Sequence, residues 1–323
     1  MKAAVWTAYG GPEVFAIREL PDPSPGDGEI LVQVRATTVT AGEVEMRRFA
    51  FRNVLSVPLR LFFGVFRPRG NRVLGQELAG EVVAVGTGVT QFDVGARVFL
   101  QTGFRFGGQA ELALASADGM VARIPDGVSY EEATTLPTGG QYALYFTRRV
   151  GIQPGDSVLV NGAAGSIGTY AIQLAKHSGA HVTAVDRGDK ATFLEDLGAD
   201  ETIDHEEGDF TRNLDSYDLI LDVIDKSSYP VAAPSLKPGG TYLHTDLSAW
   251  AAVRRGVYRS EGGRRAKMVP EAAEPGDLDL LAGMLASGDL RAVIDRVYGL
   301  EDIVAAHRHA ESGDKRGHID LSV

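Results

Sequence analysis

The first 120 residues alternate between apolar and polar side chains in short runs, the pattern of strands that bury one face. The alternation is nearly perfect over residues 30–39 (ILVQVRATTV). Shorter runs of the same character occupy residues 2–6, 79–85 and 97–100, and turn-forming residues separate them. The pattern predicts that the chain begins with a β-rich domain.

The pattern changes beyond Pro125. Ser129 and Glu132 form a capping box, in which each side chain can satisfy a free backbone N–H at the start of a helix. Short apolar runs then alternate with stretches of helical periodicity. The predicted strands are residues 157–160, 181–185, 219–223, 240–244 and 318–323, and the predicted helices are residues 166–178, 192–197, 278–286 and 300–310. The alternation predicts a parallel sheet with helices on both faces.

Three glycines spaced three residues apart join the first of these strands to the helix after it. The segment is Gly162, Ala163, Ala164, Gly165, Ser166, Ile167 and Gly168. Residues without a Cβ permit a tight turn and a close approach of backbone to pyrophosphate, and the helix N-terminus offers that anion free N–H groups. The segment therefore predicts a dinucleotide-binding turn, with a βα turn that binds no ligand as the alternative.

The next predicted strand leads into Asp186 and Arg187. An acidic residue at this place typically binds the ribose 2′-hydroxyl of NAD. A 2′-phosphate would be repelled by on the order of 4 kcal/mol at roughly 4 Å and an effective dielectric near 20. Arg187 has the opposite preference, since arginine can hold a 2′-phosphate. The pair favours NAD(H) and leaves NADP(H) possible.

Composition narrows the class of protein. The 323 residues are 44% hydrophobic and 23% charged, which is ordinary for a globular chain of about two domains. The net charge of −11 argues against a nucleic-acid partner, because phosphate contacts need a basic surface. The absence of cysteine excludes disulfides and iron–sulfur clusters and fits a cytoplasmic protein. No apolar run resembles a signal peptide or a membrane span.

Several motifs resemble those of the medium-chain dehydrogenase/reductase superfamily, and most closely its zinc-free, quinone-oxidoreductase-like branch. They include MKAAVWTAYGGPEVF, LGQELAGEVVAVGTGVTQFDVGARVF, GVSYEEATTLPTGG, IQPGDSVLVNGAAGSIGTYAIQLAK and SGDKRGHIDLSV, and they extend over nearly the whole chain. The resemblance implies an α/β fold with a GroES-like, β-rich catalytic domain over residues 1–124 and 268–323. It implies a Rossmann domain with a doubly wound parallel sheet over residues 125–267, a nicotinamide cofactor between the domains, and a homodimer.

Zinc-dependent members of the family carry a cysteine early in the first domain and a Gly-His-Glu later. This chain has Thr40 at the first place and Gln76 in place of the histidine. The first 176 residues contain neither Cys nor His, and the remaining carboxylates and carbonyls suit zinc poorly. The sequence therefore predicts no zinc and no other metal site.

Catalytic candidates follow from family position. Thr40 and Glu43 stand where the branch often has Asn and Asp, and Tyr142 could donate a proton or a hydrogen bond. For Glu43 we expect a solvated or salt-bridged carboxylate rather than a general acid. For Tyr142 a half-buried packing aromatic is the alternative of equal weight.

The resemblance also implies cofactor contacts outside the glycine turn. Thr138 is expected at the nicotinamide ribose, and His205 near the adenosine ribose or its phosphate. Val223, His244 and Thr245 follow strand ends that should face the nicotinamide.

Two basic stretches stand apart from these motifs. Residues 47–72 carry seven arginines, five phenylalanines and no acidic residue. They are interpreted as a cap over the substrate, as a surface that sits on a membrane interface, or as a segment packed on its own domain. Residues 254–267 are expected to form a mobile, solvated loop, with a clamp on the cofactor phosphates as the alternative.

Taken together, the sequence predicts a zinc-independent, NAD(P)H-dependent oxidoreductase that transfers hydride to a small quinone, an enal or enone, or a carbonyl compound. Quinones suit a protein without an evident acid, because the phenolate product is stable. Two alternatives stay open. One is a nicotinamide-binding protein that senses redox state without turnover, and the other is an enoyl reductase that acts on a carrier-bound substrate.

Overall fold

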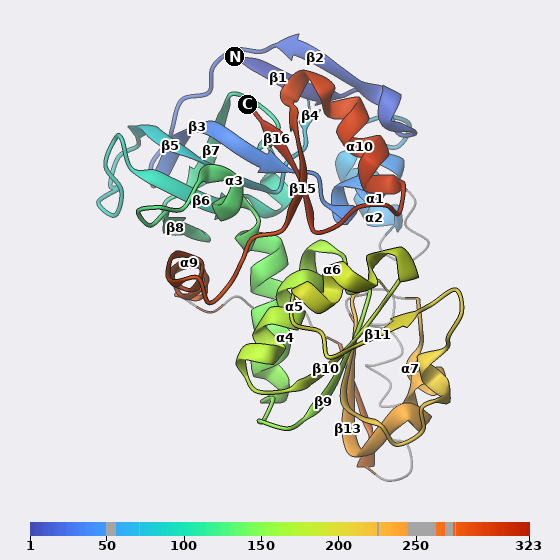
Figure 1. Ribbon diagram of the computed structural model, residues 1–323. Coiled ribbons are helices and arrows are strands. Elements are labelled where there is room, and N and C mark those ends of the chain that lie inside the picture. The colour runs from blue at the N-terminus through green and yellow to red at the C-terminus, as the bar shows by residue number, and fades with distance from the viewer. Residues whose placement is uncertain (50–55, 71, 225, 245–262, 269–273, 275) are drawn as a thin grey trace. The chain divides into compact units, whose positions relative to one another are not determined.

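The computed structural model describes the chain apart from residues 50–55, 71, 225, 245–262, 269–273 and 275 (Figure 1). It divides into two compact units. One comprises Met1–Thr138 and Leu278–Val323, and the other comprises Gly139–Asp277. The described helices include none that is long and apolar enough to cross a membrane.

The first unit is built around a mixed sheet of the order β15-β16-β3-β5-β6-β8, with β7 paired to β3. Its strands are β3 (Glu29–Thr38), β5 (Glu77–Val85), β6 (Arg97–Gln101), β7 (Leu112–Ser116), β8 (Val121–Arg123), β15 (Ile294–Gly299) and β16 (His318–Ser322). A smaller antiparallel sheet consists of β1 (Lys2–Trp6), β2 (Phe15–Glu19) and β4 (Arg72–Val73). Since β16 pairs with β3, both ends of the chain form one GroES-like domain, as predicted.

The helices of this unit are α1 (Ala41–Arg48), α2 (Ser56–Phe63), α3 (Tyr130–Thr134), α9 (Asp277–Ser287) and α10 (Ile303–Glu311). Helix α3 begins at the predicted capping box, where Glu132 N donates to Ser129 Oγ at 3.1 Å. It packs against β3, β5 and β6, so it belongs to the first unit. For this reason the first part of the unit extends to Thr138 rather than to residue 124. The second part begins at Leu278, where residue 268 was predicted.

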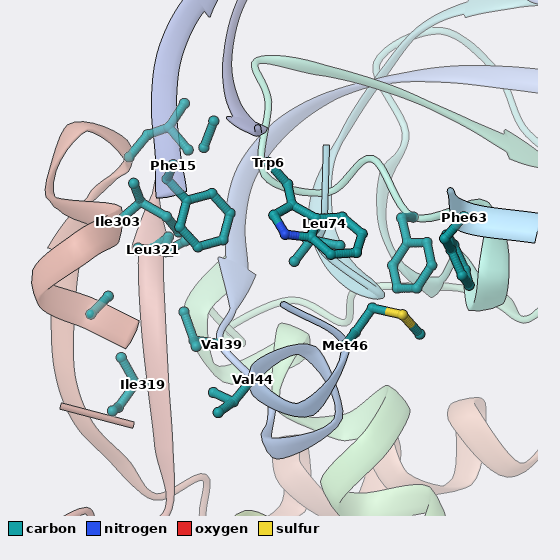
Figure 2. Packing of buried hydrophobic residues seen from close by; sticks show 14 residues of the cluster. Trp6, Phe15, Val39, Val44, Met46, Phe63, Leu74, Ile303, Ile319 and Leu321 are labelled. Atoms are coloured by element: carbon teal, nitrogen blue, oxygen red, sulfur yellow. The ribbon is translucent and has the colours of Figure 1, made fainter. Parts of the chain in front are cut away.

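A buried aromatic cluster holds α1, α2 and α10 against the small sheet (Figure 2). The ring of Phe63 lies 6.4 Å from Trp6 and 5.9 Å from Phe106, and it is fully buried. Arg47 is buried as well and donates to Gly10 O at 2.5 Å. Part of segment 47–72 is therefore packed on its own domain, which is one of the three interpretations given above.

The second unit contains a sheet whose pairs are all parallel, in the order β11-β10-β9-β12-β13-β14. Its strands are β9 (Ser157–Asn161), β10 (His181–Asp186), β11 (Glu201–Asp204), β12 (Tyr217–Asp222), β13 (Leu236–His244) and β14 (Arg265–Met268). Its helices are α4 (Gln141–Val150), α5 (Ser166–His177), α6 (Ala191–Asp196) and α7 (Tyr229–Ala232). This is the predicted doubly wound Rossmann sheet, and its topological switch point lies between β9 and β12.

One expectation about this unit is wrong. Residues 254–267 were expected to form a mobile, solvated loop, but residues from Arg265 onward form the edge strand β14. Arg264 beside it forms an ion pair with Asp215, and its Nε donates to Leu236 O at 2.6 Å. Residues 254–262 of the run lie outside the described residues.

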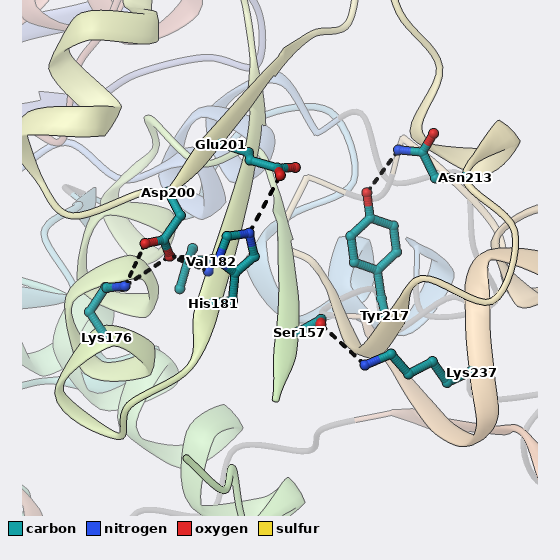
Figure 3. Close-up of polar contacts among 9 residues, drawn as sticks. All are labelled: Ser157, Lys176, His181, Val182, Asp200, Glu201, Asn213, Tyr217 and Lys237. Carbon is teal, nitrogen blue, oxygen red and sulfur yellow. Dashed lines mark hydrogen bonds and ion pairs between the residues drawn. The ribbon is translucent and has the colours of Figure 1, made fainter. Parts of the chain in front are cut away.

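At the amino ends of the parallel strands, polar contacts join the sheet to its surroundings (Figure 3). Asp200 accepts hydrogen bonds from Val182 N at 2.7 Å and from Lys176 Nζ at 2.8 Å. Lys237 Nζ donates to Ser157 Oγ at 3.2 Å. Sheets of this type bind ligands at the carboxyl ends of their strands. The contacts in Figure 3 lie at the opposite edge.

Candidate functional site

The glycine turn between β9 and α5 leaves no room for side chains. Gly162 has a φ of +85°, and a Cβ there would lie 2.4 Å from the Ile224 side chain. A Cβ on Gly168 would lie 2.4 Å from the backbone oxygen of Gly162. Gly165 has no such contact, since a Cβ there would meet only Gly162 O, at 3.3 Å. Glycine at 162 and 168 thus closes the turn, whereas glycine at 165 keeps its outer side open.

The exposure of the turn matches this division. Gly162, Ala163 and Gly168 are buried, while Gly165, Ser166 and Ile167 are partly exposed. The first N–H groups of α5 have no acceptor within the helix, and the helix dipole places partial positive charge there. The open side of the turn therefore suits an anion such as a pyrophosphate.

Asp186 ends β10 beside this turn, as predicted. Its carboxylate accepts hydrogen bonds from Ala164 N at 2.9 Å and from Arg187 N at 3.0 Å. Lys190 Nζ lies 3.0 Å from Asp186 Oδ1, and the Lys190 side chain is almost fully buried. Asp186 is therefore paired with the charge of Lys190 and hydrogen-bonded to the glycine turn.

Lys190 was not predicted from the sequence. It stands four residues after Asp186, but Asp186 ends a strand and Arg187 is extended, so no helical spacing marked the pair. Arg187, which was predicted to compete with Asp186, is paired instead with Asp189 at 3.1 Å. His205 directly follows β11, is exposed, and its N donates to Asp186 O at 3.1 Å. The predicted adenosine-end residues thus gather at neighbouring strand ends.

A buried polar network occupies the switch point. Asn161 Nδ2 donates to Asp222 Oδ1 at 3.0 Å across the ends of β9 and β12. Asp222 Oδ2 accepts from Tyr242 Oη at 2.7 Å and from Ser227 N at 2.9 Å. The network holds the segment after β12, which begins with the predicted Val223. Since it joins residues far apart in the sequence, spacing gave no signal for it.

Two further predicted residues lie at the end of β13. His244 is its last residue and is buried, with its ring 5.9 Å from Tyr242. Thr245 lies outside the described residues. In the same unit, the predicted Tyr142 lies on the first turn of α4, half-buried, with its ring 6.1 Å from Phe146.

In the first unit, Thr40 and Glu43 form a capping box at the start of α1. Glu43 N donates to Thr40 Oγ1 at 3.2 Å, and Thr40 N donates to Glu43 Oε2 at 3.3 Å. Gln76 N donates to Glu43 Oε1 at 2.7 Å, and Gln109 Nε2 donates to Oε2 at 3.2 Å. Glu43 thus connects segments that stand far apart in the chain.

The expectation of a solvated or salt-bridged Glu43 is wrong, because the side chain is fully buried and no cation pairs with it in the described part of the chain. Burial raises the pKa of Glu43 to about 8, and the charge of Glu77 adds to the rise, although the bonds from Gln76 N and Thr40 N oppose it. With this pKa, most of Glu43 is protonated and neutral at pH 7. Its proton can reach Gln109 Oε1, which otherwise has no partner, if the Gln109 amide turns over.

Burial of this acid predicts a characteristic pH dependence of stability. Between about pH 4.5 and 8 the folded chain keeps a proton on Glu43 that the unfolded chain loses, so the free energy of unfolding should fall as pH rises through this window. The contribution is at most about 1.4 kcal/mol per pH unit. Glu43→Gln, which imitates the neutral acid, should flatten this slope in urea unfolding at pH 5.5, 7 and 8.5. The exposed Glu207→Gln is the control, and an unchanged slope in Glu43→Gln would show that Glu43 is ionised in the folded chain.

Thr138 is also held by a buried carboxylate. Its N donates to Glu77 Oε2 at 2.8 Å, and the other oxygen of Glu77 accepts from the Thr38 hydroxyl. Burial raises the pKa of Glu77, and the bonds from Thr38 and Thr138 oppose the rise. Glu77 therefore fixes the backbone at the residue expected to contact the nicotinamide ribose.

Gly42 separates two polar side chains on the open face of α1. A Cβ on this exposed glycine would lie 3.6 Å from Gln76 Oε1 and 3.8 Å from Thr40 Oγ1. Thr40 and Gln76 are both partly exposed. Among the residues that the structure describes, no group of three or more acidic or histidine side chains could hold a metal ion. The face thus offers a hydroxyl and an amide at the positions where the family resemblance leads us to expect the metal ligands of zinc-dependent members.

Comparison with known proteins agrees with this geometry. The alcohol dehydrogenase GroES-like domain family matches residues 26–141, and the zinc-binding dehydrogenase family matches residues 197–319. A quinone oxidoreductase from Pseudomonas aeruginosa is 29% identical to this chain over 323 residues, 95% of this chain and 94% of that protein. The chain belongs to the medium-chain dehydrogenase/reductase superfamily. Within it, the chain falls in the zinc-free, quinone-oxidoreductase-like branch.

Solved structures of medium-chain reductases share the fold over the whole chain. The quinone oxidoreductase from Coxiella burnetii has a TM-score of 0.89 and 26% identity, and the match covers 100% of this chain and 99% of that one. A mycobacterial protein complexed with NADPH has a TM-score of 0.81 and 25% identity, with 100% of both chains covered. Both matches show that this chain has the fold of these proteins.

Proposed function

We propose that this medium-chain reductase transfers hydride from NAD(P)H to a small quinone or α,β-unsaturated carbonyl compound without a metal. The observation that carries the proposal is the pair of polar side chains, Thr40 and Gln76, on either side of the open Gly42. They stand at the places of the zinc ligands and are supported from behind by the buried acid Glu43. The similar quinone oxidoreductases support the choice of substrate class.

The described residues fit the cofactor. The open side of Gly165 and the N-terminus of α5 would hold the pyrophosphate, and Asp186 stands at the place of the adenosine ribose. When bound, the cofactor supplies the hydride, and the protein orients the substrate and excludes water. The Thr40 hydroxyl accepts from Glu43 N, and its proton finds no acceptor among the described residues. That proton is available to the carbonyl oxygen of a substrate.

Glu43 acts through its neighbours rather than on the substrate, because none of its surface is exposed. As a neutral acid it places no negative charge behind Thr40 and Gln76. A charge there would oppose the negative charge that develops on the reduced oxygen. A quinone needs only this modest assistance, since its phenolate product is stable.

For the cofactor, we propose that NADH is preferred and NADPH is accepted. The position of Asp186 at the end of β10 supports a contact with the ribose, which would favour the 2′-hydroxyl. Lys190 neutralises Asp186, which reduces the repulsion of a 2′-phosphate. The preference for NADH over NADPH should therefore be smaller than it would be if Asp186 had no cationic partner.

Steady-state reduction of 1,4-benzoquinone and trans-2-hexenal by NADH, before and after EDTA treatment, tests the proposal. We expect turnover that EDTA leaves unchanged. Gly42→Val should keep cofactor binding, because its Cβ meets no close atom, but should lower kcat/KM about tenfold or more by filling the space between Thr40 and Gln76. Gly283→Ala, on the exposed face of α9, is the control.

Other outcomes would identify the alternatives. Cofactor binding without reduction of any electrophile would favour a redox-sensing protein. Reduction of enoyl thioesters only when they are attached to a carrier protein would favour the carrier-dependent enoyl reductase. The proposed homodimer rests on family resemblance, and light scattering on the purified chain would show a mass of one chain if that part is wrong.

A further inference from the structure

An aromatic face protrudes from α2 and the turn after it. We use this name for Val57, Leu61, Phe62, Val65 and Phe66, together with Phe104 from the loop after β6. Phe66 is 92% exposed, Phe104 66% and Phe62 58%. Scattered exposed apolar residues are normal on a protein surface, but a concentration of large ones marks an interaction site.

The fold holds this turn firmly. Gly64 has a φ of +129°, and a Cβ there would overlap the backbone oxygen of Arg67. Tyr9 Oη donates to Gly64 O at 2.6 Å, and Arg69 N donates to Phe63 O at 2.8 Å. Phe63 anchors the turn in the cluster shown in Figure 2. These contacts hold the backbone of the turn, and the side chain of Phe66 on this turn is exposed to solvent.

The segment that carries most of this face has charges of one sign only. Residues 47–72 contain seven arginines and no acid in a chain of net charge −11, although Arg47 and Arg48 pair with Glu311 of α10. Arg67 and Arg69 follow Phe66 in the chain, are exposed, and have no acidic partner among the described residues. Arg60 supports the turn from its inner side, since its guanidinium lies 4.6 Å from the Phe49 ring centroid and donates to Val65 O at 2.6 Å. The projecting turn thus combines an apolar tip with unpaired cations.

We propose that the aromatic face attaches the protein to the surface of an anionic lipid bilayer. Aromatic and aliphatic side chains enter the boundary between headgroups and acyl chains, and flanking arginines bind anionic headgroups. Helix α2 has only eight residues. At about 12 Å long it offers little area by itself against the roughly 1,000 Å² that a stable protein interface needs. A bilayer needs only the insertion of the tip, so the observations favour lipid over a protein partner.

The test is co-sedimentation of the full chain with vesicles of phosphatidylcholine alone and with vesicles containing 30 mol% phosphatidylglycerol. We expect binding to the anionic vesicles, little binding to the neutral ones, and release at high salt. Phe62→Ser with Phe66→Ser should weaken partition by about tenfold for each side chain removed. Arg67→Glu with Arg69→Glu should weaken it by at least about fivefold for each arginine.

Matched changes on the second unit serve as controls. Leu214→Ser removes a side chain that is 66% exposed there, and Arg212→Glu reverses an exposed charge. Both should bind vesicles as the unchanged protein does. Thermal unfolding must show that every variant is folded, which is expected because all the changed side chains are exposed. The measurement is independent of enzyme activity, so it stands or falls separately from the proposed function.

Three results would overturn the proposal. The protein could stay in the supernatant with anionic vesicles, or the two double variants could bind as tightly as the controls. The third is loss of self-association, or of binding to an acidic carrier protein, in the double variants while the unchanged protein ignores vesicles. That result would assign the aromatic face to a protein partner.

Discussion

Gly168→Ala is expected to abolish cofactor binding and to destabilise the second unit. The added methyl group would lie 2.4 Å from Gly162 O and 2.6 Å from Ala163 O, both of them backbone atoms that cannot turn aside. Helix α5 would have to move away from β9, which takes the pyrophosphate-binding N–H groups with it. We expect a loss of about 3 kcal/mol in the free energy of unfolding and at least about 100-fold in cofactor affinity.

Gly165→Ala should behave differently. Its Cβ meets only Gly162 O at 3.3 Å, and its φ of −78° suits any residue. The fold should therefore lose at most about 1 kcal/mol through the poorer N-cap. Cofactor affinity should still fall by about 100-fold, because the methyl group would occupy the side from which a pyrophosphate approaches.

The two variants are compared by urea unfolding and by fluorescence titration with NADH, with Gly283→Ala as the control. No atom lies within 4 Å of a Cβ at Gly283, so that change should leave both quantities nearly unchanged. If Gly165→Ala bound the cofactor as tightly as the unchanged protein, the glycine turn would be a structural βα turn only.

Lys190→Gln is expected to increase the preference for NADH over NADPH. In the unchanged protein Lys190 Nζ lies 3.0 Å from the Asp186 carboxylate. Without this countercharge, the carboxylate would repel a 2′-phosphate. Repulsion on the order of 4 kcal/mol at about 4 Å is an upper value, since solvent screens a site open to ligand. We therefore expect NADPH affinity to fall about tenfold to a hundredfold more than NADH affinity.

The reciprocal change and a matched control sharpen this prediction. Asp186→Ser should move the preference toward NADPH, because Lys190 and Arg187 remain. Lys176→Gln breaks a similar ion pair, with Asp200 at 2.8 Å, at the opposite end of β10 (Figure 3). It should alter neither affinity. Equal ratios of the two affinities in Lys190→Gln and Lys176→Gln would remove Lys190 from the cofactor site.

Local signals predicted much of the fold. The capping box at Ser129 and the alternation over residues 30–39 each depend on residues close in sequence, and both match the structure. Strand β15 was missed because most of its side chains are exposed, so no apolar alternation marks it. The expectation of a loop over residues 254–267 is wrong at residues 265–267 for a related reason. Strand β14 is an edge strand whose pairing comes from β13 and not from its own hydrophobicity.

The site was predictable to the same extent. The glycine turn and Asp186 are contiguous features of one βαβ unit, so sequence spacing was enough to find them. The protonation state of Glu43 could not be predicted from the sequence, because its burial depends on Gln76 and Gln109, which lie on separate segments. An acidic residue in a polar run looks solvated until the elements that cover it are known.

The assignment of a nicotinamide cofactor is tested by fluorescence titration of the unchanged protein with NADH and with NADPH, monitored through the quenching of Trp6 and Trp250. We expect saturable binding of both cofactors, with the tighter binding for NADH. The opposite order would show that Lys190 and Arg187 outweigh Asp186. Binding of neither would contradict the assignment of the glycine turn and, with it, the proposed hydride transfer.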